Sequence, residues 1–272
     1  MWTSKDVYYI SDGTGILVAN LGQALICQFP ETSFHEEKFP FVNTRDKARK
    51  TLEYIHKYSA GRRPLVFCTI IDPEIRRIFD SPEVEFFDAL SDLLDRLEEC
   101  IEAKALREPG SSRHVNDVAM TRRVEAIHYC LEHDDGTKTD GYDQADIILL
   151  GVSRTGKTPV SVYLATQMGL KTANFPLTSE YLEQYRLPTT LRSNIKHVVG
   201  LTTTGELLHS AREKRYPGSK YARLATCREE IQQAQQILSK YNIPVVSTAG
   251  KSIEEIAIQV LEELGIEKKI MR

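Results

Sequence analysis

Short apolar runs alternate with longer amphipathic stretches along most of the chain. The runs at 64–71 and 145–150 are rich in Val, Ile, Leu and Phe, which is typical of buried strands. The stretches between the runs repeat apolar residues every three to four positions, as in a helix with one buried face. Strands that alternate with helices are typical of a parallel sheet covered by helices on both faces. The pattern therefore predicts an α/β fold.

The expected elements fall into two groups along the chain. We expect strands at 7–10, 64–71, 145–150, 172–175, 197–201 and 243–247, and helices at 16–28, 45–58, 73–79, 86–97, 118–132, 160–168, 204–214, 221–241 and 252–264. Between two of these helices lies Pro109-Gly110-Ser111-Ser112, whose residue types favour a linker or a lid. This predicts an N-terminal α/β domain at 1–110 and a second α/β domain, with a mostly parallel sheet, at 111–272.

A glycine-rich turn separates the expected strand at 145–150 from the helix after it. The turn matches G-x-x-x-x-G-K-[ST] at every fixed position, and it reads Gly151, Val152, Ser153, Arg154, Thr155, Gly156, Lys157, Thr158. A strand before this motif and a helix after it are the context that a phosphate-binding loop requires. Backbone N–H groups would surround a phosphate at the positive end of the helix dipole. The C-terminal domain is thus predicted to be a P-loop nucleotide-binding domain.

Side chains of the turn suggest the chemistry of the bound group. Lys157 would place a positive charge on the outer phosphates, and the Thr158 hydroxyl is a tentative ligand for Mg²⁺. The acidic residue that usually helps to hold Mg²⁺ in such enzymes is missing, because the later strands end in Leu201-Thr202-Thr203 and Val246-Ser247-Thr248. This makes an ordinary ATPase or GTPase a poor fit. The acidic alternatives lie upstream, at Asp134, Asp135, Asp146 and Asp72.

Two further groups of residues could contact phosphate. Ser11, Asp12, Gly13 and Thr14 follow the first expected strand and open a helix, so they form either a second anion-binding turn or an ordinary helix cap. Arg212 and Arg215 are three residues apart and share a helix face. Such a pair could bind a phosphate, although solvated helix charge is the commoner explanation for a single arginine.

The distribution of charge and cysteines along the chain limits the partners and the location that we expect. The 272 residues carry a net charge of −3, but residues 1–150 hold 18 basic and 27 acidic side chains, whereas residues 151–230 hold 12 basic and 6 acidic ones. A positive excess beside the phosphate loop would attract polyanions. Neither a membrane span nor a secretory signal is expected, and five scattered cysteines favour reduced thiols in the cytoplasm. Nucleic acid is not an expected partner, because no fold motif for it occurs.

The chain resembles the bifunctional kinase–pyrophosphorylases that regulate phosphoenolpyruvate synthase and pyruvate, phosphate dikinase. The resemblance spans nearly the whole chain and is carried by Tyr9-Ile10-Ser11-Asp12-Gly13-Thr14, Pro73-Glu74-Ile75-Arg76, His133-Asp134-Asp135-Gly136, the segment from Ala145 to Pro159, and Arg212-Glu213-Lys214-Arg215. Glycine at position 156 is similar to the phosphoenolpyruvate synthase branch. The dikinase branch often resembles S-R-T-S-K at the same place.

The resemblance implies two opposed reactions. ADP would donate its β-phosphoryl group to a threonine of the target enzyme, and inorganic phosphate would later remove that group and release pyrophosphate. Residues 151–158 would bind the ADP phosphates, Lys157 and Arg154 would act in catalysis, and Asp135 or Asp134 would be the general base, with Asp146 and Asp72 behind them. A homodimer is implied too. The residues alone leave two alternatives open, namely a small-metabolite P-loop kinase and a nucleotide-sensing module without catalysis.

Overall fold

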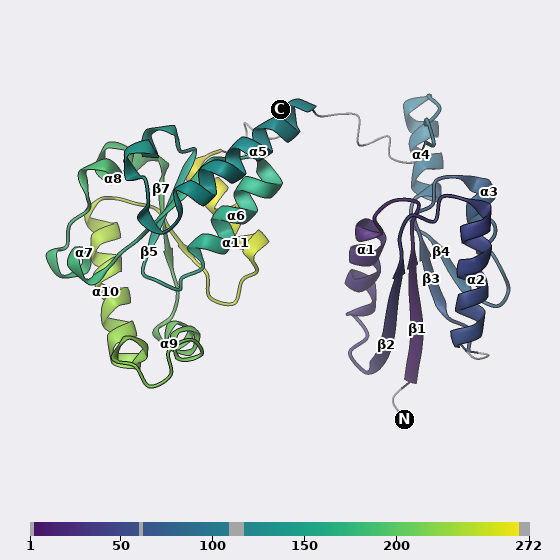
Figure 1. The fold of residues 1–272 in the computed structure, drawn as a ribbon, viewed down its shortest axis with the longest axis horizontal. Coiled ribbons are helices and arrows are strands. Elements are labelled where there is room, and N and C mark those ends of the chain that lie inside the picture. The colour runs from purple at the N-terminus through teal and green to yellow at the C-terminus, as the bar shows by residue number, and fades with distance from the viewer. Residues whose placement is uncertain (1–2, 60–61, 109–116, 267–272) are drawn as a thin grey trace. The chain divides into compact units, whose positions relative to one another are not determined.

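The computed structural model describes residues 3–59, 62–108 and 117–266. It divides the chain into two compact units, residues 1–115 and residues 116–272, each built on a four-stranded parallel sheet (Figure 1). This confirms the predicted α/β fold with an N-terminal and a C-terminal α/β domain. The expected linker at Pro109–Ser112, and with it the expected boundary after residue 110, lies outside the described residues.

The first unit has the strand order β2-β1-β3-β4, with every neighbouring pair parallel. Helix α1 lies on one face of the sheet, and α2 and α3 lie on the other (Figure 1). Its elements are β1 (Thr3–Ile10), α1 (Ile16–Ile26), β2 (Thr32–Phe39), α2 (Arg45–Ser59), β3 (Leu65–Cys68), α3 (Pro73–Arg76), β4 (Glu85–Asp88) and α4 (Ser91–Ile101).

Side-chain alternation along the central strand β1 explains the two-sided core of this unit. Val7 and Tyr9 pack with α1 on one face, whereas Tyr8 and Ile10 pack with α2 on the other. All four side chains are buried. A parallel strand covered on both faces reads as an unbroken apolar run. This is why the pattern at 7–10 predicted a strand.

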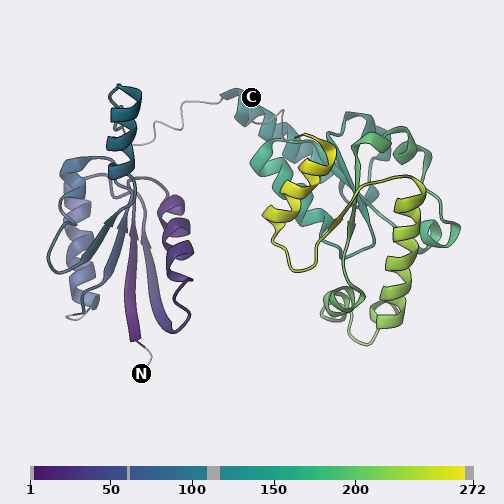
Figure 2. The same cartoon turned by 180° about the vertical axis from the view of Figure 1, so that it is seen from behind.

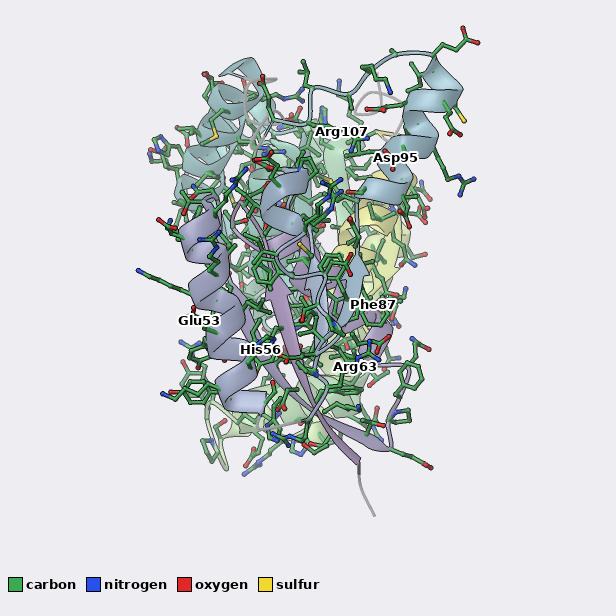
Figure 3. The ribbon with its side chains drawn as sticks, turned by 90° about the vertical axis from the view of Figure 1, so that its right-hand side faces the viewer. Glu53, His56, Arg63, Phe87, Asp95 and Arg107 are labelled. Carbon is green, nitrogen blue, oxygen red and sulfur yellow. The ribbon has the colours of Figure 1, made fainter. Side chains whose placement is uncertain are left out.

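The two outer strands of the first unit differ from the prediction. Residues 32–39 form β2, which was not expected, because their side chains alternate between half-buried and exposed positions. The helix predicted at 86–97 is wrong at its start, because residues 85–88 pair with β3 as strand β4 and the helix α4 begins only at Ser91. Beyond α4, Arg107 returns to the helix, where it pairs with Asp95 and Glu98 (Figure 3).

The second unit has the strand order β6-β5-β7-β8, again with all pairs parallel. Helices α6 and α11 pack on one face, and α10 packs on the other (Figure 2). Its elements are α5 (Asp117–Glu132), η2 (Asp134–Gly136), η3 (Thr139–Gln144), β5 (Ile147–Gly151), α6 (Lys157–Met168), β6 (Thr172–Pro176), α7 (Ser179–Gln184), α8 (Thr189–Ser193), η4 (Ile195–His197), β7 (Val198–Thr202), α9 (Gly205–Glu213), η5 (Lys220–Ala222), α10 (Leu224–Lys240), β8 (Val245–Ser247) and α11 (Ile253–Leu264).

Both sheets place their first strand between the second and the third. Ligands of such open sheets bind beyond the carboxyl ends of the strands, where the direction of strand addition reverses. In the second unit this point follows β5 and holds residues 151–158. In the first unit it follows β1 and holds residues 11–14. Over the part of the chain that the structure describes, no helix is both long and apolar enough to cross a bilayer.

Candidate active site

The turn at 151–158 has the backbone geometry of an anion-binding loop. Arg154 has φ 77° and Gly156 has φ 87°, so two left-handed residues, separated by Thr155, stand just before α6. Such alternation directs successive N–H groups toward one concavity. Within the described residues, the N–H groups of Ser153, Arg154 and Gly156 have no acceptor. They are therefore available to an anion at the start of α6.

Glycine is required at the first position of the loop. A Cβ on Gly151 would lie 2.4 Å from the backbone oxygen of Leu201 in β7. The end of β5 thus approaches the neighbouring strand more closely than any side chain allows. The Thr155 hydroxyl closes the loop from within by donating to the Val152 oxygen at 3.0 Å.

Lys157 lies beneath the loop and is only 4% exposed. Its Nζ donates to the Val152 oxygen at 3.1 Å. Burial lowers the pKa of Lys157 from 10.5 to about 8, and the nearby Asp135 and Asp134 carboxylates oppose that shift. Burial thus destabilises the charged form of Lys157, and a bound anion would stabilise it.

Asp134 contacts the loop directly, although it lies 17 residues before Gly151, the first residue of the loop. Its Oδ1 accepts the Thr158 hydroxyl at 2.9 Å and the side-chain amide of Asn174 in β6. The buried Asn174 amide also donates to Ser161 at 3.3 Å. This places a carboxylate beside the Thr158 hydroxyl, where the later strands provide none.

Asp135 adopts a left-handed conformation, with φ 49°. The Asn174 Oδ1 accepts its backbone N–H at 3.0 Å, while its carboxylate is exposed beside the loop. His133 anchors the other end of this turn, because its ring stacks on Tyr129 at 3.8 Å and Nδ1 contacts the Tyr129 oxygen at 2.7 Å. The turn thus holds Asp135 in a strained but fixed position.

A cavity of about 590 Å³ lies against the loop. Asp135, Ser153 and Arg154 line one part of it, and Arg215, Tyr216 and Tyr221 line another. Arg215 and Arg154, both expected near phosphate, therefore face the same cavity as Asp135.

Arg212 lies elsewhere, because its side chain is fully buried. One Nη donates to Glu230 at 2.6 Å and to the Ser153 oxygen at 3.2 Å, and the other donates to the Tyr221 oxygen at 3.1 Å. The guanidinium also stacks on the Tyr221 ring at 3.9 Å. Arg212 therefore supports the loop from behind and does not line the cavity, and the phosphate contact considered for it stays a prediction.

The other two acidic residues are in capping or supporting positions. Asp146 precedes β5 and accepts the Lys171 N–H at 2.9 Å, so it lies at the opposite end of the strand from the loop. Asp72 caps α3 in the first unit by accepting the N–H groups of Glu74 and Ile75. Among the described acidic candidates, only Asp134 and Asp135 adjoin the phosphate loop.

The turn at 11–14 belongs to the first unit. The Ser11 hydroxyl accepts the Gly13 N–H at 3.1 Å, and the Asp12 carboxylate accepts the Ile71 N–H at 3.0 Å. Gly15 then starts α1 with φ 75° and no side-chain cap. Ser11 and Asp12 thus stabilise their own turn, and they leave the α1 N-terminus without the helix cap considered from the sequence.

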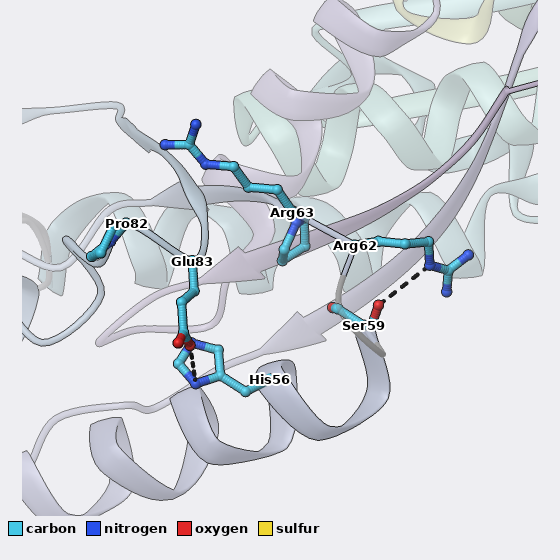
Figure 4. A pocket seen from close by; sticks show the side chains of 7 residues that line it. His56, Ser59, Arg62, Arg63, Pro82 and Glu83 are labelled. Carbon is cyan, nitrogen blue, oxygen red and sulfur yellow. Dashed lines mark hydrogen bonds and ion pairs between the residues drawn. The ribbon is translucent and has the colours of Figure 1, made fainter.

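A second cavity, of about 410 Å³, lies near the amino ends of β3 and β4 (Figure 4). Several of its polar groups pair with one another, because His56 contacts Glu83 at 3.0 Å and Arg62 donates to the Ser59 oxygen at 3.3 Å. Ligands of parallel sheets bind at the opposite edge. The cavity at the phosphate loop is therefore the better candidate, although both are of similar size.

The positive charge of residues 151–230 does not all lie at the phosphate loop. Lys157, Arg154 and Arg215 lie at the phosphate loop, as expected. Lys171 and Lys196 precede β6 and β7, at the far edge of the sheet. Only part of the positive excess therefore surrounds the candidate site.

Three residues that contribute to the site are marked by no sequence motif. Asn174 stands inside an apolar strand, and a buried amide at the carboxyl half of a strand could have drawn attention to it. Tyr221 and Glu230 follow the loop by more than 60 residues, and no spacing rule connects them with it. Their role depends on how α9 and α10 fold back on β5.

Comparisons with known proteins identify the family of the chain. Residues 7–261 match the family described as Kinase/pyrophosphorylase. A protein of Desulfotalea psychrophila is 45% identical over 261 residues, 96% of each chain. One of Legionella pneumophila (strain Corby) is 40% identical over 267 residues, 97% of this chain and 98% of that protein. One of Neisseria meningitidis serogroup C / serotype 2a is 38% identical over 274 residues, 99% of this chain and all of that protein. Each bears the name "Putative phosphoenolpyruvate synthase regulatory protein". This chain therefore belongs to the kinase/pyrophosphorylase family, as its resemblance indicated.

Proposed function

We propose that this protein transfers the β-phosphoryl group of ADP to a threonine of phosphoenolpyruvate synthase and, in a second reaction, removes it with inorganic phosphate. The observation that carries the proposal is the contact between the Asp134–Asp135 turn and the phosphate loop, through Thr158 and Asn174. It brings a phosphate-binding turn, a buried lysine and an unpaired carboxylate to one place. The relatives' name supports the choice of target.

In the forward reaction, the threonine oxygen forms a bond to the β-phosphorus and the bond from that phosphorus to the α–β bridging oxygen breaks. AMP leaves with that oxygen. The threonine proton needs an acceptor. Asp135 fits this role better than Asp134, because Asp134 Oδ1 already accepts two hydrogen bonds. Lys157 and the loop N–H groups would neutralise the charge on the phosphoryl oxygens.

In the second reaction, an oxygen of inorganic phosphate attacks the phosphorus of phosphothreonine. The bond from phosphorus to the threonine oxygen breaks, and pyrophosphate forms. Protonated Asp135 would return a proton to the threonine oxygen. One loop serves both directions in this scheme, since ADP and pyrophosphate share a diphosphate group.

Mg²⁺ is compatible with the residues present. The ion prefers oxygen ligands and keeps several waters, so one or two protein groups suffice alongside substrate phosphates. Asp134 and Thr158 offer a carboxylate and a hydroxyl 2.9 Å apart. No cluster of three or more His, Cys, Asp or Glu suited to a metal occurs in the described ranges. A bound Mg²⁺ would neutralise phosphate charge during transfer.

The test is phosphoryl transfer from ADP labelled at its β-phosphate. Phosphoenolpyruvate synthase and pyruvate, phosphate dikinase would be assayed side by side, and label on the synthase alone is expected. Label on the dikinase alone would reassign the target. ADP binding without transfer to either protein would favour a nucleotide-sensing module, and turnover with a small hydroxylated metabolite would favour a metabolite kinase.

Variants then separate one shared site from two. Lys157→Ala should abolish both reactions, while Lys196→Ala removes an exposed lysine at the far edge of the sheet and should leave both intact. Asp135→Asn should abolish transfer and keep ADP binding. Release of pyrophosphate by Lys157→Ala would instead indicate a second phosphate site, for which residues 11–14 are the candidate.

A further inference from the structure

In the part of the chain that the structure describes, the cavity beside the phosphate loop carries two arginines without a carboxylate partner. Arg154 and Arg215 both line it, and neither forms an ion pair with a carboxylate in the described part of the chain. The nearest ring to Arg215 is Tyr216, whose centroid lies 5.9 Å from the guanidinium carbon. By contrast, Arg212 and Arg228 in the same region each bond a glutamate at 2.6 Å. Two unpaired guanidinium groups at one cavity are suited to a phosphoryl group.

The position of Asp135 indicates whether this cavity binds the acceptor or the leaving group. In-line transfer places the entering and leaving oxygens on opposite sides of the phosphorus. If Asp135 accepts the threonine proton, the threonine enters from the cavity that Asp135 lines. AMP then departs on the other side. A neutral adenine in this cavity would also leave both guanidinium groups without an anion.

We propose that this cavity binds the acceptor residue of the protein substrate, and that Arg154 and Arg215 bind its phosphoryl group once the threonine is phosphorylated. The inference rests on the proposed function and adds the location and chemistry of the acceptor site. In the forward direction the arginines receive the transferred group. In the reverse direction they hold phosphothreonine while phosphate occupies the loop.

The remaining wall of the cavity is aromatic. Tyr216 is 50% exposed, and its ring meets that of Tyr221 edge to face at 6.0 Å. Arg212 covers Tyr221 from behind and fixes its place. An exposed tyrosine beside two arginines offers contact area to the residues that flank the acceptor. The site therefore suits a phosphothreonine within a polypeptide.

Binding of O-phosphothreonine to the full chain saturated with AMP, followed by ³¹P NMR titration, tests the inference. Arg215→Ala should weaken this binding by about tenfold or more. Arg154→Gly should do the same, since glycine accepts the left-handed backbone at that position. Lys220→Ala is the matched control, because it removes an exposed positive charge between two cavity residues and should change binding by no more than about twofold.

ADP affinity separates this inference from the alternative occupant. Arg215→Ala should change ADP affinity, measured by calorimetry, no more than Lys220→Ala does. Loss of ADP affinity with unchanged phosphothreonine binding would place adenine in the cavity and overturn the inference. Absence of phosphothreonine binding by the unmodified chain, or equal effects of Arg215→Ala and Lys220→Ala, would also overturn it.

The acceptor site and the proposed function can fail independently of each other. If neither target enzyme is labelled from ADP but O-phosphothreonine still binds through Arg215, the assignment of donor or target falls and the acceptor site stands. If labelling succeeds and Arg215→Ala does not raise the KM for the phosphorylated target in the phosphate-dependent reaction, the acceptor site falls and the proposed function stands.

Discussion

Asn174 Oδ1 accepts the backbone N–H of Asp135 at 3.0 Å, and this single bond holds a left-handed residue in place beside the phosphate loop. The same side chain donates to Asp134 and to Ser161. Because Asn174 is fully buried in β6, its position is set by the sheet. The position of the Asp134–Asp135 turn is therefore linked to the strand next to β5.

Asn174→Ala should lower both stability and catalysis. The change removes the partner of the Asp135 N–H and one partner of the Asp134 carboxylate, and we expect the free energy of unfolding to fall by about 1–3 kcal/mol. Because the turn is then free to move, kcat for phosphoryl transfer should fall more than affinity for ADP. Urea unfolding and transfer kinetics measure the two effects.

Asn194→Ala provides the control for that change. Asn194 donates its side-chain amide to the Thr190 oxygen at 2.9 Å, in the segment that precedes β7 and so away from the loop. The variant should lose some stability and keep kcat. Equal loss of kcat in both variants would show that Asn174 acts only through general stability.

The buried pair of Arg212 and Glu230 should contribute more to stability than an exposed pair. Arg212→Met leaves Glu230, whose side chain is 17% exposed, without its cation. Breaking a buried pair by removing one partner costs about 3–5 kcal/mol. Arg228→Met breaks the exposed pair with Glu206, in which the side chains are 62% and 59% exposed, and should cost far less because solvent screens such a pair.

Denaturant unfolding of the single variants and of Arg212→Met with Glu230→Gln distinguishes the causes. The double variant should regain part of the loss, since no buried charge remains unpaired. If Arg212→Met is no more destabilising than Arg228→Met, the guanidinium is not the support of the loop that its contacts with Ser153 and Tyr221 indicate.

Lys157 should make ADP binding weaken at alkaline pH. Its pKa is lowered by burial to about 8, so the free protein loses the positive charge as the pH rises through that value. Bound phosphate favours the charged form, so binding above pH 8 requires uptake of a proton. The value of kcat/KM for ADP should therefore fall about tenfold per pH unit well above 8.

The measurement runs upward from pH 7.5, where the ADP phosphates, with a second pKa of about 6, are already ionised. Lys157→Arg keeps its charge throughout this range, and so its residual kcat/KM should show no alkaline fall. A fall with the same midpoint in both proteins would assign the titration to another group.

The sequence predicted the central strands and the turn between β5 and α6 more reliably than the edges of the first sheet. Central strands such as β1 and β5 are covered on both faces and read as apolar runs. Strand β2 has one neighbour and carries His35, Glu36, Glu37 and Lys38, so its pattern resembles a polar loop. Phe86 and Phe87 were assigned to a helix because α4 follows them by only a few residues.

Local motifs predicted the site only where its residues are close in sequence. Residues 151–158 form one turn, and their spacing alone indicates phosphate binding. Asp134 and Asp135 were candidates, but both are held beside the loop by Asn174, which no motif marks. Arg212 and Arg215 share a helix face in the sequence pattern, yet α9 ends at Glu213, so the two guanidinium groups diverge.

The two glycines of the loop should differ in what an added methyl group does. At Gly151 a Cβ would lie 2.4 Å from the Leu201 oxygen, a backbone atom that moves only if β5 or β7 moves. We expect Gly151→Ala to cost about 1–3 kcal/mol in stability and to abolish ADP binding, because the loop begins at the displaced strand end.

At Gly156 nothing lies within 4 Å, so Gly156→Ala should cost only the left-handed strain of about 1–2 kcal/mol. ADP affinity should therefore fall less than in Gly151→Ala. Thermal unfolding and calorimetry on both variants test this. Loss of ADP binding in Gly156→Ala, with binding retained in Gly151→Ala, would show that loop flexibility at residue 156 matters more than the approach of β5 to β7.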